Sequence, residues 1–315
     1  MKKDINGSTR LAGVIGWPIE HSLSPTMHNA AYSRLGLDWV YLPLPVRESA
    51  DVPAVVAAIR SLPFVGFNVT MPYKRLMLEL CDEVAAQAQL AGAVNTVKVV
   101  DGRLMGYNTD GRGLLESLRD DVDFAPEGKR AVVLGSGGAA GAIVAALVLA
   151  RVAHMTIVSR DPAHADELIA RMAPYARDTE LTVVRAGEES GPLVQAADLV
   201  INSTPLGMRP GDASPTRGEW LHAGQVVSDM IYSPPDTPLL RAAQAAGATT
   251  LGGLGMLVAQ GAISLEIWNG DSAVSAPRDV MRDAADAALK SEWTAEDHRG
   301  DETGADDIAA LLAEL

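Results

Sequence analysis

Short apolar runs alternate with longer segments of helical periodicity through the first third of the chain. Apolar runs bounded by turn residues predict strands. We expect strands over residues 11–16, 39–46, 65–70 and 93–100, with a helix over 77–92 before the last of them. Strands interleaved with helices predict βαβ units and a mostly parallel sheet.

A second series of alternating elements begins near residue 129. Each of its strands is a mostly apolar run between turn residues, as expected for strands covered on both faces. These predicted strands are residues 129–135, 154–160, 197–205 and 225–232. An Ala-rich helix over 138–151 follows the first of them, and a last long helix over 255–270 ends at Gly270.

The composition changes at Ser291, where the chain becomes polar and acidic. Such a composition predicts a linker or a loose tail. Within it, residues 306–315 combine an initial Asp with apolar residues at helical spacing, which predicts a short terminal helix. No apolar run is long enough to cross a membrane, and no secretory signal is apparent at the start.

Charge and cysteine content narrow the class of protein. The net charge of −14 argues against a nucleic-acid partner or an anionic membrane surface. Cys81 is the only cysteine, which excludes an internal disulfide and indicates a reducing, cytoplasmic compartment. The six His are scattered without metal-ligand spacing, so we expect no metal site and a small-molecule substrate.

A glycine-rich segment, GSGGAAGA, lies between the strand over 129–135 and the helix that follows it. Gly135, Gly137 and Ala140 match the dinucleotide-binding pattern G-x-G-x-x-G/A in the expected strand–turn–helix context. The first Gly permits a tight turn, and the second lets the backbone approach a pyrophosphate at the helix N-terminus. A purely structural turn is the alternative interpretation.

The end of the next strand bears on the choice of nicotinamide cofactor. An acidic residue there would bind the ribose 2′-hydroxyl of NAD. This chain instead has Ser159 and Arg160, which can bind a 2′-phosphate, followed by Asp161, which would repel one. We expect NADP, with NAD as the alternative and a solvated Arg as the structural interpretation.

Polar residues cluster at the predicted strand ends of the first part of the chain, where ligands bind in α/β sheets. Lys74 and Asp110 can supply the proton donor and acceptor that hydride transfer to a carbonyl requires. Asn108 and Thr109 fit turn or capping roles. Near the start, the hydroxyls of Ser22 and Ser24 fit either helix caps or one wall of a site for a polyhydroxylated ligand.

The whole set of motifs resembles the shikimate dehydrogenase family over about residues 11–285. The matching segments, in family order, are PIEHSLSP, NVTMPYK, AVNTV, GYNTDGRG, LGSGGAAGA, NSTPLGM, DMIYSPPDTPLL and GGLGMLVAQGA. The resemblance implies reversible reduction of 3-dehydroshikimate to shikimate with NADPH, in the pathway to chorismate and aromatic amino acids. It is also compatible with assembly as a homodimer.

The resemblance also implies individual roles. Lys74 and Asp110 match the catalytic pair. The residues that match substrate contacts are Ser22, Ser24, Thr70, Asn95, Tyr232 and Gln260. Those that match cofactor contacts are Gly135, Gly137, Gly138, Ala139, Ser159, Arg160, Met230 and Gly253. The family's NADP motif is altered here, since Asp161 replaces its Thr and His164 stands at its second basic position.

We therefore expect two α/β domains with the ligands in the cleft between them. Residues 1–111 form the substrate-binding and catalytic domain, and 112–251 form a Rossmann-type dinucleotide-binding domain. Residues 252–290 return as helix to the first domain, and 291–315 form the acidic tail. A quinate or aminoshikimate dehydrogenase using NAD or NADP, and a non-catalytic ligand sensor, are the alternative functions.

Overall fold

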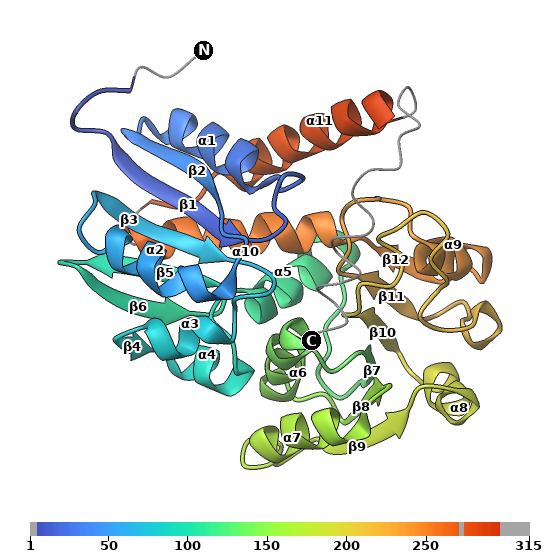
Figure 1. Cartoon of the computed structure of the whole chain (residues 1–315). Coiled ribbons are helices and arrows are strands. Elements are labelled where there is room, and N and C mark those ends of the chain that lie inside the picture. Colours follow the sequence, from blue (N-terminus) through green and yellow to red (C-terminus); the bar gives the residue numbers. More distant parts are fainter. Residues whose placement is uncertain (1–4, 271–273, 297–315) are drawn as a thin grey trace.

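The computed structural model describes residues 5–270 and 274–296, with side chains up to residue 291. Figure 1 shows two α/β lobes, one built around each of two sheets, with helices α5 (Asp110–Val122) and α10 (Gly253–Asn269) between them. The predicted α/β class with a Rossmann-type second half is confirmed. None of the described helices has the length and apolarity to span a bilayer.

The first sheet has the strand order β2-β1-β3-β5-β6-β4. Its strands are β1 (Arg10–Gly16), β2 (Trp39–Pro45), β3 (Phe64–Val69), β4 (Glu83–Val84), β5 (Thr96–Val100) and β6 (Arg103–Tyr107). The sheet is mostly parallel, as expected, and β5 alone runs antiparallel to its neighbours β3 and β6. A two-residue turn of Asp101 and Gly102, both at positive φ, joins β5 to β6, and this geometry suits a tight hairpin.

The helix expected over 77–92 was wrong in its extent. The segment divides into α3 (Leu76–Leu80), the short strand β4 and α4 (Ala86–Ala91). Cys81 takes an extended backbone, and the Asp82 carboxylate accepts hydrogen bonds from Arg60 and from the Leu104 N–H. These contacts to distant residues override the local helical pattern.

The second sheet is parallel throughout, with the order β12-β11-β10-β7-β8-β9. Its strands are β7 (Arg130–Leu134), β8 (His154–Ser159), β9 (Glu180–Arg185), β10 (Leu199–Asn202), β11 (Val226–Asp229) and β12 (Thr249–Leu251). Read from β9, this is the doubly wound order of a dinucleotide-binding domain. Strands are added outward in one direction from β7 to β9 and in the opposite direction from β10 to β12, while β7 and β10 themselves are parallel. The sequence pattern missed β9 and β12, which are half-exposed or short edge strands.

Helices cover both sheets. They are α1 (Ser24–Leu35), α2 (Val52–Ile59), α6 (Gly138–Leu149), α7 (Pro162–Met172), α8 (Gly191–Gln195), α9 (Pro238–Ala245) and α11 (Arg278–Glu296), in addition to those already named. Helix α6 is Ala-rich and buried on almost every side, because α4, α5 and α7 all pack against it. Its small side chains permit this close packing.

Helix α10 carries the chain from the second lobe back to the first (Figure 1). The Trp268 indole N–H donates to the Val97 carbonyl at 2.9 Å, and the ring fills the space that a side chain at Gly66 would take. Helix α11 then lies beside α1 and continues to Glu296, past the composition change at Ser291. The terminal helix expected over 306–315 lies outside the described residues.

Candidate active site

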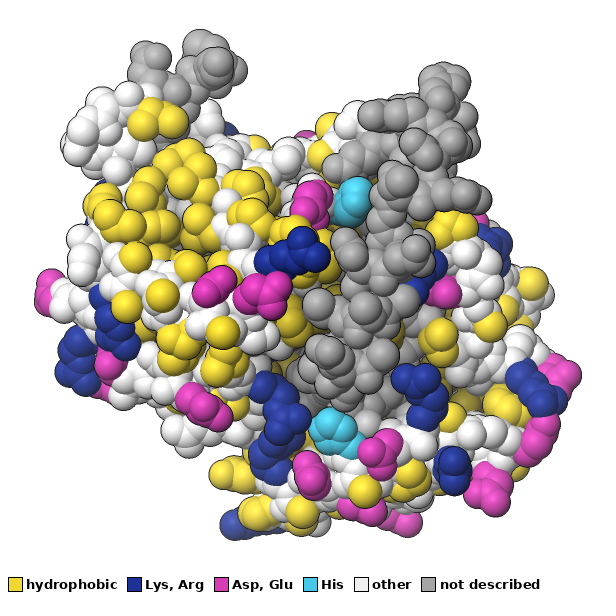
Figure 2. All heavy atoms as spheres, in the orientation of Figure 1, with side chains coloured by type: hydrophobic (Ala, Val, Ile, Leu, Met, Phe, Trp, Pro, Cys, Tyr) yellow, Lys and Arg dark blue, Asp and Glu magenta, His cyan; other side chains and the backbone are white. Residues whose placement is uncertain are grey.

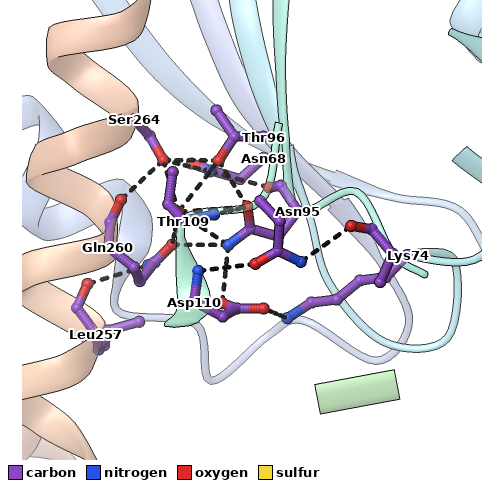
Figure 3. Close-up of polar contacts among 11 residues, drawn as sticks. Asn68, Lys74, Asn95, Thr96, Thr109, Asp110, Leu257, Gln260 and Ser264 are labelled. Carbon is purple, nitrogen blue, oxygen red and sulfur yellow. Dashed lines mark hydrogen bonds and ion pairs between the residues drawn. The ribbon is translucent and has the colours of Figure 1, made fainter. Parts of the chain in front are cut away.

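An ion pair joins the turn after β3 to the first residue of α5 (Figure 3). Lys74 Nζ lies 2.7 Å from Asp110 Oδ2, and the two side chains are 21% and 7% exposed. Asp110 stands at the helix N-terminus, where the backbone favours negative charge. Its own N–H donates to Asn108 Oδ1 at 3.0 Å, which is the turn role expected for Asn108. The carboxylate is therefore buried and fixed, while the ammonium keeps access to solvent.

Asn95 holds the other oxygen of this carboxylate. Its Nδ2 donates to Asp110 Oδ1 at 2.8 Å and to Thr109 Oγ1 at 2.9 Å, while its Oδ1 accepts from the Thr109 N–H at 2.8 Å. Gln260 reaches the same group from α10, with its Oε1 3.4 Å from Asn95 Nδ2. Four of the predicted site residues, including Lys74, thus form one continuous set of contacts.

A second polar layer lies behind the first and locks three elements together. Asn68 Nδ2, on β3, donates to Ser264 Oγ on α10 at 3.0 Å and to Thr96 Oγ1 on β5 at 3.1 Å. Thr96 Oγ1 also lies 2.9 Å from Asn95 Oδ1, so the two layers are joined. These four residues are buried, and a satisfied buried network of this kind holds its members in one geometry.

The Ser pair lies at the start of α1 and connects to this network. Neither Ser caps the helix, because the capping position is Leu23 and no side chain fills the cap. The buried Ser24 hydroxyl hydrogen-bonds Tyr41, whose own hydroxyl donates to Asn68 Oδ1 at 2.8 Å. Burial raises the pKa of Tyr41 well above its usual value, and the Ser24 bond acts in the opposite direction. Ser22 Oγ is 3.4 Å from the Ser24 N–H.

Two further predicted substrate residues border the same region. Thr70 follows β3 directly, its N–H donates to the Ile15 carbonyl at 2.9 Å, and its methyl group occupies the space beside Gly16. Its side chain shares no hydrogen bond with Lys74 or its partners among the described residues. Tyr232 leaves the second sheet after β11 and packs half-buried against the apolar cluster of α1 and α10.

The glycine loop has the open backbone that a pyrophosphate requires. Gly135 has φ +108°, and a Cβ there would lie 2.8 Å from Ser203 Oγ, so only glycine fits. Gly137 and Gly138 are exposed, and a Cβ at either would meet nothing within 4 Å. Helix α6 begins at Gly138, and Ala139 lies in its first turn. Uncovered backbone N–H groups at a helix N-terminus fit a phosphate, so these residues suit a dinucleotide.

At the end of β8, Asp161 was expected to repel a 2′-phosphate, and the structure shows its carboxylate bound to the start of α7. Its carboxylate accepts a hydrogen bond from the Ala163 N–H at 3.1 Å and caps α7, so its charge is directed to the helix. Ser159 is buried, its Oγ is 2.8 Å from Ser136 Oγ, and it donates to the Asp161 carbonyl. Arg160 is exposed and makes no ion pair among the described residues.

Met230 and Gly253 meet where the second sheet gives way to α10. The Met230 carbonyl occupies the place of a Cβ on Gly253, whose N–H donates to the Ile231 carbonyl at 3.1 Å. The preceding Asp229 is buried, which raises its pKa, although hydrogen bonds from Thr237, Ile231 and Asn202 oppose the rise. These bonds hold the segment that leads to Tyr232.

Sequence reasoning missed Tyr41, Thr96 and Ser264 as parts of the site. Ser264 could have been found, because it lies one helical turn after Gln260 and so on the same face of α10. No such signal marked Tyr41, because a Tyr within an apolar strand is predicted to be a residue of the hydrophobic core. Among the described residues no group of His, Cys, Asp and Glu could hold a metal ion.

Comparison with known proteins identifies the family of this chain. Residues 14–97 match the model of the shikimate dehydrogenase substrate binding domain, and residues 253–285 match that of the shikimate 5'-dehydrogenase C-terminal domain. A shikimate dehydrogenase (NADP(+)) of Citrifermentans bemidjiense is 46% identical over 84% of this chain and 92% of its own. One from Geobacter metallireducens is 42% identical over 91% and 99%. The chain belongs to the shikimate dehydrogenase family.

Solved structures of family members agree. Shikimate 5-dehydrogenase from Thermus thermophilus, crystallised with NADP(H) and shikimate, aligns with a TM-score of 0.79 at 34% identity, over 89% of this chain and all of that one. Quinate dehydrogenase from Corynebacterium glutamicum, in complex with NAD, aligns with a TM-score of 0.80 at 31% identity, over 88% and 98%. The family resemblance is confirmed, and the fold is shared by a shikimate dehydrogenase crystallised with NADP(H) and a quinate dehydrogenase crystallised with NAD.

Proposed function

We propose that this protein is an NADP-dependent shikimate dehydrogenase that interconverts 3-dehydroshikimate and shikimate in the cytoplasm. The observation that carries the proposal is the Lys74–Asp110–Asn95 arrangement, found in a chain of this family beside an open glycine loop. A sensor of the same fold would need neither a partly exposed ammonium held on a buried carboxylate nor that loop.

Lys74 is the proton donor in this proposal. A bound nicotinamide dinucleotide supplies the hydride that forms the new C–H bond at the C3 carbonyl of the substrate. As the C=O π bond breaks, Lys74 gives a proton to the developing alkoxide and then regains one from solvent, to which its side chain is 21% exposed. Asp110 and Asn95 orient the ammonium and the substrate hydroxyl.

The other predicted residues divide between the two ligands. We propose that Ser22, Ser24 and Tyr232 bind the substrate carboxylate and that Thr70 and Gln260, with Asn95, bind ring hydroxyls. For the cofactor, we propose that the pyrophosphate lies on the glycine loop and that Ser159 and Arg160 bind the 2′-phosphate. Met230 and Gly253 would border the nicotinamide. A homodimer is proposed as the assembly, to be checked by analytical ultracentrifugation.

Steady-state kinetics of the purified protein with shikimate and with quinate, each with NADP and with NAD, test the function. We expect shikimate with NADP to have the highest kcat/KM. Quinate has a tetrahedral C1 with an added hydroxyl, and a pocket that cannot pair this group loses about 1–3 kcal/mol, or about five- to a hundredfold in rate. Two small hydroxyls at Ser22 and Ser24 fit the planar carboxylate of shikimate.

Each other result points to a named alternative. Quinate turnover equal to or above that of shikimate would make the protein a quinate dehydrogenase. A higher kcat/KM with NAD would overturn the cofactor assignment. Binding of shikimate, seen by calorimetry, with no turnover in any combination would leave the ligand sensor.

A further inference from the structure

Basic side chains from both lobes meet where α7 faces the turn after β3. Arg75 Nη1, in the first lobe, lies 3.4 Å from His164 Nε2, in the first turn of α7. Arg171, near the other end of α7, is lowered in pKa by burial and then by the charge of Arg75. Its guanidinium lies over Gly92 and Gly141, at the contact of α4 with α6. Figure 2 shows Lys and Arg side chains near a His in the lower part of the molecule, with Asp and Glu side chains close by.

Among the described residues Arg75 has no acidic partner, whereas the charge of Glu167 acts on Arg171. Some exposed arginines, such as Arg103 and Arg241, form ion pairs with Glu83 and Asp236, whereas Arg34 forms none among the described residues. Neither Arg75 nor Arg160 forms an ion pair anywhere in the described part of the chain. The protein has a net charge of −14, so acidic side chains are plentiful. Exposed cations without counter-charges, brought together from two lobes, are typical of an anion site.

The fold indicates which anion belongs there. In a doubly wound sheet the ribose 2′ position lies at the end of the second strand, here β8, which ends at Ser159. Helix α7 begins three residues later at Pro162, and His164 is in its first turn. Arg75 thus reaches the same helix start that follows Arg160.

The contact with His164 leaves Arg75 available for a phosphate. An Arg can only donate, so His164 Nε2 is the acceptor side of this 3.4 Å contact. The contact involves only Nη1 of Arg75, so the other N–H groups of its guanidinium remain available. A guanidinium fork matches phosphate oxygens in geometry as well as charge.

We infer that Arg75 binds the 2′-phosphate of NADP together with Arg160, so that the substrate-binding lobe takes part in cofactor selection. The inference rests on the proposed function. Arg75 directly follows Lys74, whose ammonium is held by Asp110. One of the residues that distinguish NADP from NAD is then the chain neighbour of the residue that protonates the substrate.

Isothermal titration calorimetry of the full chain tests this with two fragments that lack nicotinamide, 2′,5′-ADP and 5′-ADP. We expect Arg75→Gln to weaken 2′,5′-ADP by about three- to thirtyfold, the range for one solvent-exposed charge-assisted contact, and to leave 5′-ADP within about twofold. Arg75→Lys keeps the charge without the fork and should lie between. Arg160→Gln should show the same selectivity as Arg75→Gln.

Arg34→Gln is the matched control, since it removes from α1 of the same lobe an exposed charge that has no ion pair among the described residues. Equal loss of both fragments in Arg75→Gln would mean that Arg75 supports the contact between lobes, and unchanged binding would mean that it faces solvent. Either result overturns the inference while the function stands. A wild-type protein that binds 5′-ADP as tightly as 2′,5′-ADP would instead refute the proposed cofactor.

Discussion

At the scale of single residues, the pairing of Lys74 with Asp110 concentrates the proposed chemistry in one contact. Lys74→Ala removes the proton donor but leaves the buried Asn95–Asp110 bond in place. We expect the kcat of Lys74→Ala to be lower than that of the wild type by on the order of a hundredfold or more, the range for a lost general acid. The effect on KM should be smaller. Steady-state kinetics with shikimate measure both constants.

Lys129→Ala is the control, because Lys129 is exposed in the turn before β7 and the change removes the same charge and side chain. Its kcat should equal that of the wild type. Asp110→Asn keeps the shape of the carboxylate but not its charge, so the ammonium is no longer held by an ion pair and turnover should drop as well. A Lys74→Ala enzyme within a few-fold of wild type would remove Lys74 from the mechanism.

At the scale of elements, the glycine-rich segment has two roles, the proposed cofactor binding at Gly137 and helix packing at Gly141. A Cβ at Gly137 would meet nothing, whereas a Cβ at Gly141 would run into the Ala91 carbonyl of α4. We expect Gly137→Ala to cost at most about 1 kcal/mol of stability, as for Ala at a helix N-cap, yet to weaken NADP by about tenfold or more. Thermal unfolding and calorimetric titration measure the two effects.

Gly141→Ala should show the opposite balance. The clash forces α6 and α4 apart. The free energy of unfolding should therefore fall by about 1–3 kcal/mol, the usual cost of overpacking. Cofactor affinity should change only as far as the folded fraction does. If Gly137→Ala bound NADP like the wild type, the pyrophosphate would not approach the backbone at that position.

At the scale of the whole molecule, α10 and the first lobe enclose a titratable group that the proposed chemistry does not use. His28 is fully buried and stacked on Tyr41 at 4.4 Å between ring centres, with Trp268 of α10 at 5.4 Å. Burial lowers the pKa of His28 from 6.5 to about 3. The folded state therefore keeps this ring neutral at pH values where the unfolded chain protonates it.

The sign of the resulting pH dependence follows directly. The stability that His28 contributes is complete above pH 6.5 and is lost as the pH falls toward about 3, because the unfolded state binds the extra proton. The loss is about 1.4 kcal/mol per pH unit, or roughly 2 kcal/mol between about pH 7 and about pH 5.

His28→Leu should remove this slope while leaving the carboxylate titrations in place. Denaturant unfolding of both proteins at several pH values measures it, and the wild type should lose stability relative to the variant as the pH falls below about 6.5. Comparing slopes rather than absolute stabilities separates titration from the change in packing. Parallel curves for the two proteins would show that His28 becomes protonated in the folded state.

Local sequence was sufficient for much of the site. The glycine loop could be recognised because the turn, the close approach of backbone and the helix start all depend on residues near Gly135 and Gly137. The same holds for Lys74 and Asp110, which lie at predicted strand ends where α/β sheets bind ligands. Strands β7 and β8 were placed well, because fully buried parallel strands give continuous apolar runs.

Tertiary structure alone decided the rest. The antiparallel direction of β5, the break in the helix expected over 77–92 and the meeting of Arg75 with His164 all depend on partners far away in the chain. Asn95 and Gln260 are 165 residues apart, and only the return of α10 brings them together. Periodicity records which face of an element is buried and turn chemistry records where the chain bends. Neither records which distant side chain will lie opposite, because that depends on how whole elements pack.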